Sequence, residues 1–265
     1  TIKELAVATY TSTGTIIRLA KKLGYHGYED FKADFLKEVY YLDTHFKNID
    51  PNFPFVKTDN IQKIASKVTL LAQETLSDTL ALLEHDNLQK ALRIMQKANQ
   101  IHLAAISYSL LLGQIFKLDM LRIGKNVNIC NTNGEELFLP AVIKNNDCII
   151  IISYSGEIHN LCSLARTLKG RSVPIIAITS LGDNELKKYA DVVLHISTRE
   201  KLYSKIAGYS NENSIKLILD ILYSCYFNLM YDDNLARRIA ISKQAEVGRE
   251  STLEIMKEDN TQSGT

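Results

Sequence analysis

Two hydroxyl side chains and a glycine follow the most apolar run of the chain, in the sequence CIIIISYSGEIHN. The run ends at Ser153, and Ser155 and Gly156 come just before a helical pattern that begins at about Glu157. Free amides at the start of a helix, together with nearby hydroxyls, bind oxygen-rich anions such as phosphate. Gly156 has no Cβ, so the backbone can approach a ligand closely there. This spacing favours a phosphate site where a strand meets a helix.

The same spacing also fits an ordinary turn in which Ser155 only caps the helix. Glu157 mildly favours this alternative, because a carboxylate repels an anion that is bound beside it. From the residues alone, both interpretations stay open.

Polar and basic residues lie on one face of a short helical pattern near the start of the chain. Thr1 and Glu4 have the spacing of a capping box for a first helix, and Ser12 is placed to cap a second helix that Gly24 can end. The apolar face of this second helix consists of Ile16, Leu19, Ala20 and Leu23. Its opposite face carries small polar residues first and cations later, as a helix needs in order to enter the major groove and reach phosphates.

This pattern predicts a helix-turn-helix that binds double-stranded operator DNA. The candidate DNA contacts are Ser12, Thr13, Thr15, Arg18, Lys21 and Lys22. Residues 1–28 carry four cations and one acidic residue, whereas the whole chain has a net charge of only +1. On spacing alone, a helical hairpin with a solvated basic face explains the pattern equally well.

The elements that must position these residues follow from the hydrophobic periodicity. Five short apolar runs are expected to be strands: 101–106, 127–130, 148–153, 174–179 and 192–196. The helical patterns lie at about 59–83, 87–98, 109–123, 135–143, 157–169, 183–189 and 214–230. Strands that are apolar throughout and alternate with helices predict an α/β fold, a doubly wound five-stranded parallel sheet flanked by helices. Such sheets bind ligands beyond the carboxyl ends of their strands.

Two prolines, Pro51 and Pro54, mark a linker at residues 43–58. We expect it to separate a small all-α domain at 1–42 from the α/β domain at 59–242. A polar tail follows at 243–265.

Composition and cysteine usage exclude several classes of protein. The 265 residues are 46% hydrophobic and 23% charged, as in ordinary globular proteins. Four scattered cysteines predict reduced thiols in a cytoplasmic protein, and six histidines without ligand spacing predict that no metal or cofactor is bound. No apolar stretch is long enough for a bilayer, so we expect no membrane partner. Hydrolase, NTPase and dinucleotide-binding motifs are absent from the sequence.

The segment TIKELAVATYTSTGTIIRLAKKLGYHGYEDFK resembles the helix-turn-helix of RpiR-type bacterial transcriptional regulators. The matching residues are Ile2, Glu4, Leu5, Ala6, Ser12, Thr15, Ile16, Ile17, Arg18, Lys22, Leu23, Gly24, Gly27 and Tyr28. Members of this family usually have further helices upstream, so we expect the 1–42 domain to be N-terminally incomplete. One helix-turn-helix reads few base pairs, so we expect a homodimer or homotetramer that packs through the helices at about 60–98 and 214–230.

The Ser153-x-Ser155-Gly156 sequence resembles the second serine motif of SIS (sugar isomerase) domains, and the likeness extends over about residues 60–230. It implies a SIS-type sheet that binds a sugar phosphate effector. The first motif of these domains, Gly-x-Gly-x-Ser, falls on Ala105, Ser107 and Ser109, so both of its glycines are replaced. The effector contacts that the resemblance implies are Ser109, Ser153, Ser155, Gly156, Ser180 and Glu200.

Taken together, these patterns predict a transcriptional regulator of carbohydrate metabolism that senses a sugar phosphate and is not an enzyme. A phosphosugar isomerase is one alternative, and it would need a positioned acid and base, for which Glu157, His159 and Glu200 are candidates. The other alternative is a phosphosugar-binding module whose N-terminal helices serve only for assembly. The helix-turn-helix discriminates between them, because isomerases of this fold do not need one.

Overall fold

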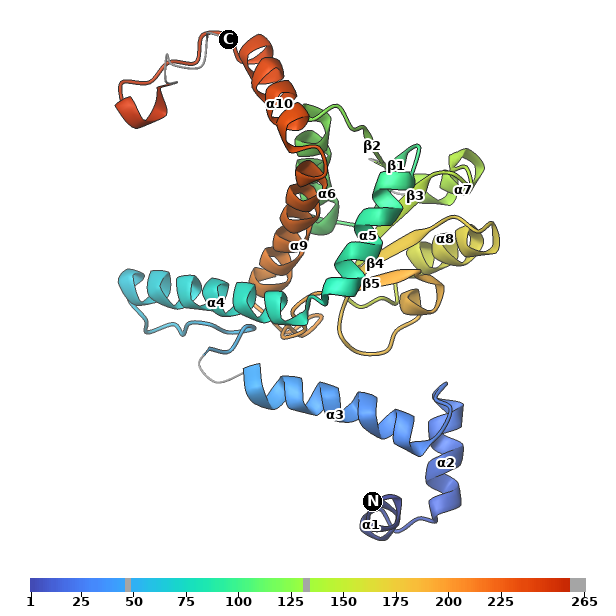
Figure 1. The fold of residues 1–265 in the computed structure, drawn as a ribbon. Helices are drawn as coiled ribbons and strands as arrows, with labels where there is room; N and C mark the ends of the chain where they lie inside the picture. The colour runs from blue at the N-terminus through green and yellow to red at the C-terminus, as the bar shows by residue number, and fades with distance from the viewer. Residues whose placement is uncertain (46–48, 131–133, 258–265) are drawn as a thin grey trace.

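A five-stranded parallel sheet lies at the centre of the computed structural model, which describes residues 1–45, 49–130 and 134–257 (Figure 1). Its strands are β1 (Ile101–Ala104), β2 (Val127–Ile129), β3 (Cys148–Ser153), β4 (Ile175–Thr179) and β5 (Val192–His195). Each strand falls within a predicted apolar run, and their order in the sheet is β2-β1-β3-β4-β5. The chain leaves β1 toward one edge and returns to β3 on the other side. The switch point, where such sheets bind ligands, is therefore between the carboxyl ends of β1 and β3.

Helices cover both faces of the sheet, as the alternation along β3 requires. Cys148, Ile150 and Ile152 belong to the core on one face, and Ile149 and Ile151 belong to the core on the other. The first face is covered by α5 (His85–Lys97), α6 (Tyr108–Arg122) and α9 (Tyr209–Asn228). The second is covered by α7 (Leu139–Val142), α8 (His159–Gly170) and the 3-10 turn η2 (Leu186–Tyr189). The α/β fold with a doubly wound parallel sheet is confirmed.

Two further long helices extend from this layered core (Figure 1). Helix α4 (Ile61–Leu82) packs against α9, and α10 (Tyr231–Ala245) follows α9 and reaches α6. Short 3-10 turns, η1 (Glu135–Leu137) and η3 (Glu254–Met256), complete the described elements. The sequence pattern did not predict α10, whose last residues lie in the segment expected to be a tail.

The N-terminal part consists of α1 (Ile2–Ala8), α2 (Thr13–Lys22) and α3 (Tyr28–His45). The capping box of α1, the Ser12 cap of α2 and the left-handed Gly24 at φ +96° are all present. Of the predicted apolar face of α2, Ile16 and Ala20 are buried. Leu19 and Leu23, on the same predicted face, are about half exposed (50% and 49%).

Helix boundaries differ from the prediction at several points. Helix α3 ends at His45, inside the predicted linker, and residues 46–48 of that linker and 258–265 of the tail lie outside the described residues. Helix α9 begins five residues before the predicted position. The predicted helix at 135–143 is divided into η1 and α7, and the one at 183–189 is only the turn η2.

Candidate functional site

All six predicted DNA contacts are exposed on α2 or at its cap. The Ser12 hydroxyl accepts from the Thr15 amide at 3.2 Å and lies 2.9 Å from the Thr15 hydroxyl. Arg18 donates to the same Thr15 hydroxyl at 3.5 Å. Ser12 and Thr15 thus fix the start of the helix, while Lys21 and Lys22 place two positive charges in its last turn.

The predicted phosphate contacts lie at the carboxyl ends of neighbouring strands. Ser153 ends β3, Ser109 is in the first turn of α6 just after β1, and Ala104 of β1 pairs with Ile151 of β3. Ser180 follows β4, and its amide donates to the Tyr154 carbonyl at 3.2 Å. The structure therefore brings residues 153–156, which we call the serine loop, against the end of β4 and beside the loop that follows β1.

The serine hydroxyls hold the serine loop in a tight turn. Ser153 Oγ accepts from the Gly156 amide and Ser155 Oγ accepts from the Glu157 amide, each at 3.2 Å. Gly156 has φ +67°, a conformation that favours glycine. Helix α8 begins only at His159, and its N-cap residue, Ile158, makes no side-chain capping bond. Ser155 therefore does not cap α8 directly, and the start of α8 keeps its positive dipole end open to an anion.

The loop after β1 keeps a glycine-type backbone although serine has replaced the glycine. Ser107 has φ +56° and ψ −131°, a region that L-residues rarely occupy, and it precedes α6. The Ser107 side chain, at the N-cap position, makes no capping bond to the first turn of α6. Two helices with uncapped N-termini thus start from adjacent strands, on either side of the switch point.

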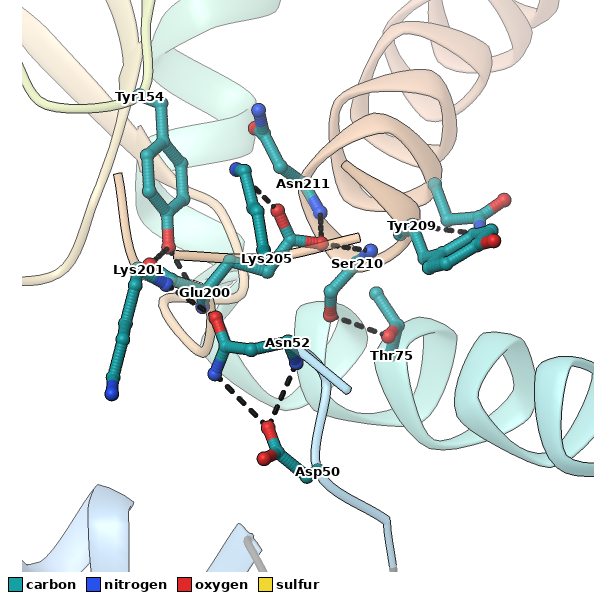
Figure 2. A network of polar contacts seen from close by, with 11 residues as sticks. Asp50, Asn52, Thr75, Tyr154, Glu200, Lys201, Lys205, Tyr209, Ser210 and Asn211 are labelled. Carbon is teal, nitrogen blue, oxygen red and sulfur yellow. Dashed lines mark hydrogen bonds and ion pairs between the residues drawn. The ribbon is translucent and has the colours of Figure 1, made fainter. Parts of the chain in front are cut away.

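Tyr154, between the two serines, connects the serine loop to Glu200 (Figure 2). Its hydroxyl donates to the Glu200 carbonyl at 2.7 Å and accepts from the Glu200 amide at 3.0 Å. Burial raises the pKa of this phenol to about 12, so it stays protonated and able to donate. Tyr154 was not among the residues predicted from the sequence, although its place between Ser153 and Ser155 was a signal that could have identified it.

The Glu200 carboxylate is fully buried and is bonded on both of its oxygens. Oε1 accepts from the amides of Ser210 and Asn211 at the start of α9, and Oε2 lies 2.8 Å from Lys205 Nζ. Lys205 also lies over the Tyr154 ring, 5.4 Å from its centroid. Glu200 thus supports the mouth of the site, and no local sequence pattern indicated Lys205.

The three candidate acid–base residues, Glu157, His159 and Glu200, lie in different local environments. Glu157 Oε1 accepts from the Glu185 amide at 2.9 Å, and Glu200 is held at α9. His159 is exposed at the start of α8. In this arrangement both carboxylates hold backbone amides.

Metal chemistry finds no support in the part of the chain that the structure describes. No group of three or more His, Cys, Asp or Glu side chains there could hold a metal ion. None of the four cysteines, all of which lie in the described ranges, forms a disulfide, and burial raises the pKa of Cys148 to about 12. None of the helices within the described ranges is long and apolar enough to cross a membrane.

Two family models match the chain. A helix-turn-helix domain of the rpiR family matches residues 1–40, and a SIS domain matches residues 94–223. The first match contains all six predicted DNA contacts, and the second contains the serine loop and Glu200. Together they cover more than half of the chain.

Two curated relatives match over most of the chain. An uncharacterized HTH-type transcriptional regulator of Clostridium perfringens is 23% identical over 90% of this chain and 84% of its own length. The regulator YbbH of Bacillus subtilis is 24% identical over 84% of this chain and 77% of its own length.

Among solved structures, the NanR protein of Vibrio vulnificus complexed with ManNAc-6P matches with a TM-score of 0.64 and 21% identity. The match covers 92% of this chain and 86% of that one. Phosphoheptose isomerase GmhA of Neisseria gonorrhoeae matches a smaller share of the chain, at a TM-score of 0.54 and 15% identity. It covers 64% of this chain and 100% of that one. Helices α1 and α2 and the five-stranded parallel sheet lie in the residues that the two family models match. The chain therefore belongs to the rpiR family of helix-turn-helix regulators that carry a SIS domain.

Proposed function

We propose that this chain is a sugar-phosphate-responsive transcriptional regulator of carbohydrate metabolism. Its α2 binds operator DNA, and the loops after β1 and β3 bind the effector. One observation carries the proposal: a basic, exposed recognition helix and two uncapped helix N-termini at a switch point occur in the same chain. The functional units are residues 1–42 and 59–242, joined by 43–58, with 243–265 as the tail.

The effector is a sugar phosphate whose phosphate group occupies the serine loop. Ser109, Ser153, Ser155 and the Gly156 backbone contact it, because they surround the starts of α6 and α8 where the helix dipoles favour negative charge. Ser180 lines the mouth, and Glu200 supports it from behind through Lys205 and the start of α9. The NanR structure supports this choice of ligand class, since its bound ManNAc-6P is a sugar phosphate.

On DNA, α2 lies in the major groove with Thr13 near base edges and its cations at phosphates. Ser12 and Thr15 orient the helix start, and Arg18, Lys21 and Lys22 bind the backbone. The regulator acts in the cytoplasm, where operator DNA is found and where free cysteines stay reduced.

The active form is a homodimer or homotetramer. An exposed apolar stripe on α6 supports self-association; it consists of Leu111, Ile115, Leu118 and Leu121. These residues recur at helical spacing, and contiguous apolar surface of this kind marks interaction sites. This stripe lies outside the two helical regions that the sequence analysis named.

We also propose that the protein does not isomerise its ligand. The support is that Glu157 and Glu200 hold backbone amides, while His159 is solvent-exposed. Proton NMR of glucose 6-phosphate and of arabinose 5-phosphate incubated with the protein checks this. The sugar spectra should stay unchanged, and appearance of a ketose or aldose product would contradict the proposal.

A thermal-shift panel paired with DNA binding tests the regulator proposal. The panel contains ManNAc-6P, glucose 6-phosphate and arabinose 5-phosphate, with each free sugar as its matched control. A ligand at 100 times its dissociation constant stabilises the folded protein by about 2.7 kcal/mol. We expect one phosphate to raise the melting temperature and to change the affinity for DNA from upstream of the protein's own gene. The proposal would be contradicted if none of the phosphates changed the melting temperature and the DNA affinity, or if the free sugars changed them equally.

A further inference from the structure

The segment that follows the helix-turn-helix is fastened to the α/β part by a buried asparagine. Asn52 is only 7% exposed, and its side-chain Oδ1 accepts from the Lys201 amide at 2.7 Å. Its carbonyl accepts from the Ile206 amide at 2.9 Å. Its own amide and Nδ2 both donate to Asp50 Oδ1, at 2.8 and 3.0 Å. We call residues 49–52 the anchor segment.

A second contact holds the anchor segment to the same loop. Arg199 donates to the Ile49 carbonyl at 3.4 Å and forms an ion pair with Glu74 of α4 at 3.0 Å. The loop at residues 199–206 follows β5. It therefore contacts the anchor segment through its first residue, Arg199, and its last residue, Ile206.

The serine loop and the anchor segment bind the same peptide group of the 199–206 loop, the one between Glu200 and Lys201. The Tyr154 hydroxyl donates to the carbonyl of Glu200, and Asn52 accepts from the amide of Lys201 (Figure 2). That carbonyl and that amide belong to one peptide unit, which is planar and rigid. A displacement of Tyr154 therefore moves the partner of Asn52 directly, with no soft dihedral between the two bonds. Hydrogen bonds on the two sides of one peptide also polarise one another.

The anchor segment restrains the helix-turn-helix by its short distance along the chain. Helix α3 ends at His45 and the anchor segment begins at Ile49. Four residue steps span at most about 14 Å even when fully extended. The end of α3 therefore cannot leave the neighbourhood of Arg199 and Asn52 while those bonds persist.

Ligand binding has a direct route to Tyr154. Ser153 and Ser155 accept from the amides of Gly156 and Glu157. A phosphate held by these hydroxyls and amides competes with those bonds and shifts the backbone on both sides of Tyr154. A bound anion also attracts the ammonium group of Lys205, which is paired with Glu200 and lies over the Tyr154 ring.

We propose that Tyr154 and Asn52 are positioning residues that couple the serine loop to the DNA-binding helices through the peptide between Glu200 and Lys201. This inference rests on the proposed function, because it assigns the path by which the effector changes DNA binding. Neither Tyr154 nor Asn52 needs to contact DNA for this role, and Asn52 does not need to contact the effector. Together they set where α3 is held when the serine loop is empty or filled.

Two variants remove the two bonds separately. Tyr154→Phe keeps the ring and deletes only the hydroxyl, and Asn52→Ala deletes the side chain that binds Lys201. Lys57→Ala is the matched control, because it truncates an exposed side chain in the same linker. Circular dichroism and thermal melting establish that each variant is folded.

Three measurements are made on the full chain with ManNAc-6P as the probe: probe affinity by calorimetry, DNA affinity without probe, and DNA affinity with saturating probe. Coupling between sites in proteins typically changes affinity by about 5- to 150-fold. We expect Asn52→Ala to bind the probe within about threefold of wild type while its DNA affinity changes less than about twofold on probe addition. Tyr154→Phe should show the same reduced response, and combining the two should reduce it no further. Lys57→Ala should respond as wild type.

Hydrogen exchange adds a readout that does not depend on the probe. Loss of the Asn52 side-chain bond in Asn52→Ala should speed exchange of the Lys201 amide.

The outcomes separate this inference from the proposed function. A wild-type protein that responds to the probe, with variants that respond equally, overturns the coupling alone. A loss of response explained by equally weakened probe binding overturns it too, because the residues would then serve the ligand site. A wild type whose DNA binding changes with no sugar phosphate of the panel contradicts the proposed function, and the coupling falls with it.

Discussion

Gly156 and Asn184 pack so closely that a Cβ on the glycine would lie 2.2 Å from the Asn184 carboxamide carbon. Asn184 is buried and donates to Thr179 Oγ1 and to the Gly182 carbonyl, each at 3.2 Å. The Gly156 carbonyl accepts from the Leu186 amide at 3.0 Å. The serine loop and the segment after β4 therefore form one packed unit, and its shape depends on the missing side chain.

Gly156→Ala should lower both stability and effector affinity. The new Cβ meets Asn184, and the residue must keep a φ of +67° that alanine disfavours. We expect the free energy of unfolding to fall by roughly 1–3 kcal/mol, measured by urea denaturation. The control is Gly170→Ala, where a Cβ would meet nothing within 4 Å. Equal stability of the Gly156 variant and wild type would show that the unit can rearrange freely.

Replacing Lys21 and Lys22 with alanine should weaken DNA binding at every sequence. Each phosphate contact contributes about 0.9 to the slope of log affinity against log salt concentration, so losing both lowers the slope by about 1.8. Fluorescence anisotropy over a series of salt concentrations measures it. The control, Lys97→Ala, removes an exposed cation on α5. An unchanged slope with intact α1–α3 would remove these lysines from the interface.

Charges placed in the α6 stripe should break the oligomer. The double variant Leu111→Glu, Leu118→Glu replaces two leucines with carboxylates. These leucines are 60% and 57% exposed in the single chain, so the monomer should still fold. Burying those charges in an interface without partners is strongly unfavourable. Sedimentation should show an oligomer for wild type and for the exposed Gln244→Glu control, and a monomer for the double variant. An oligomer that survives both substitutions would place the interface elsewhere.

Acid should remove a stabilising contribution from Glu185. Hydrogen bonds from Lys188, Tyr189 and Arg166 lower the pKa of this carboxyl from 4.5 to about 2. The folded pKa is below the ordinary value, so the contribution is complete above pH 4.5 and is lost as the pH falls toward 2. The difference in melting temperature between wild type and Glu185→Gln should therefore shrink between pH 4.5 and pH 2.5. The exposed Glu250→Gln variant is the control, and a Glu185 difference that is constant over this range contradicts the assignment.

The strands could be predicted because their burial leaves an unbroken apolar record. All six residues of β3 are buried, and its sequence CIIIIS shows this directly. Helix α10 was not predicted: none of its residues is buried, and polar and charged residues outnumber its apolar ones. Leu19 and Leu23 lie on the predicted apolar face of α2 but are about half exposed, so periodicity identified the face and not the extent of burial.

The start of α9 was missed for a different reason. Ser210 looks like a loop residue, yet it is fully buried and its hydroxyl lies 2.6 Å from that of Thr75 in α4. Ser214, where the predicted helix begins, is also fully buried and accepts from Thr79 of α4 at 2.7 Å. Buried hydroxyl pairs between helices have no signature in the hydrophobic pattern.

Of the candidate site, the serine loop followed from local spacing, whereas its support by Glu200, Lys205 and Asn52 did not. Those contacts join residues up to 149 positions apart, and only the fold brings them together.

The most direct test of the account is a calorimetric titration of the Ser153→Ala, Ser155→Ala double variant with the sugar phosphate that wild type binds. Each lost bond to a charged phosphate costs about 1.5–3 kcal/mol, so the affinity should fall at least about 100-fold. The exposed Ser66→Ala variant of α4 should bind as wild type, and DNA binding without ligand should persist in both variants. A folded double variant that binds the sugar phosphate as tightly as wild type would contradict the account, because the serines would then only shape the turn and the effector would bind elsewhere.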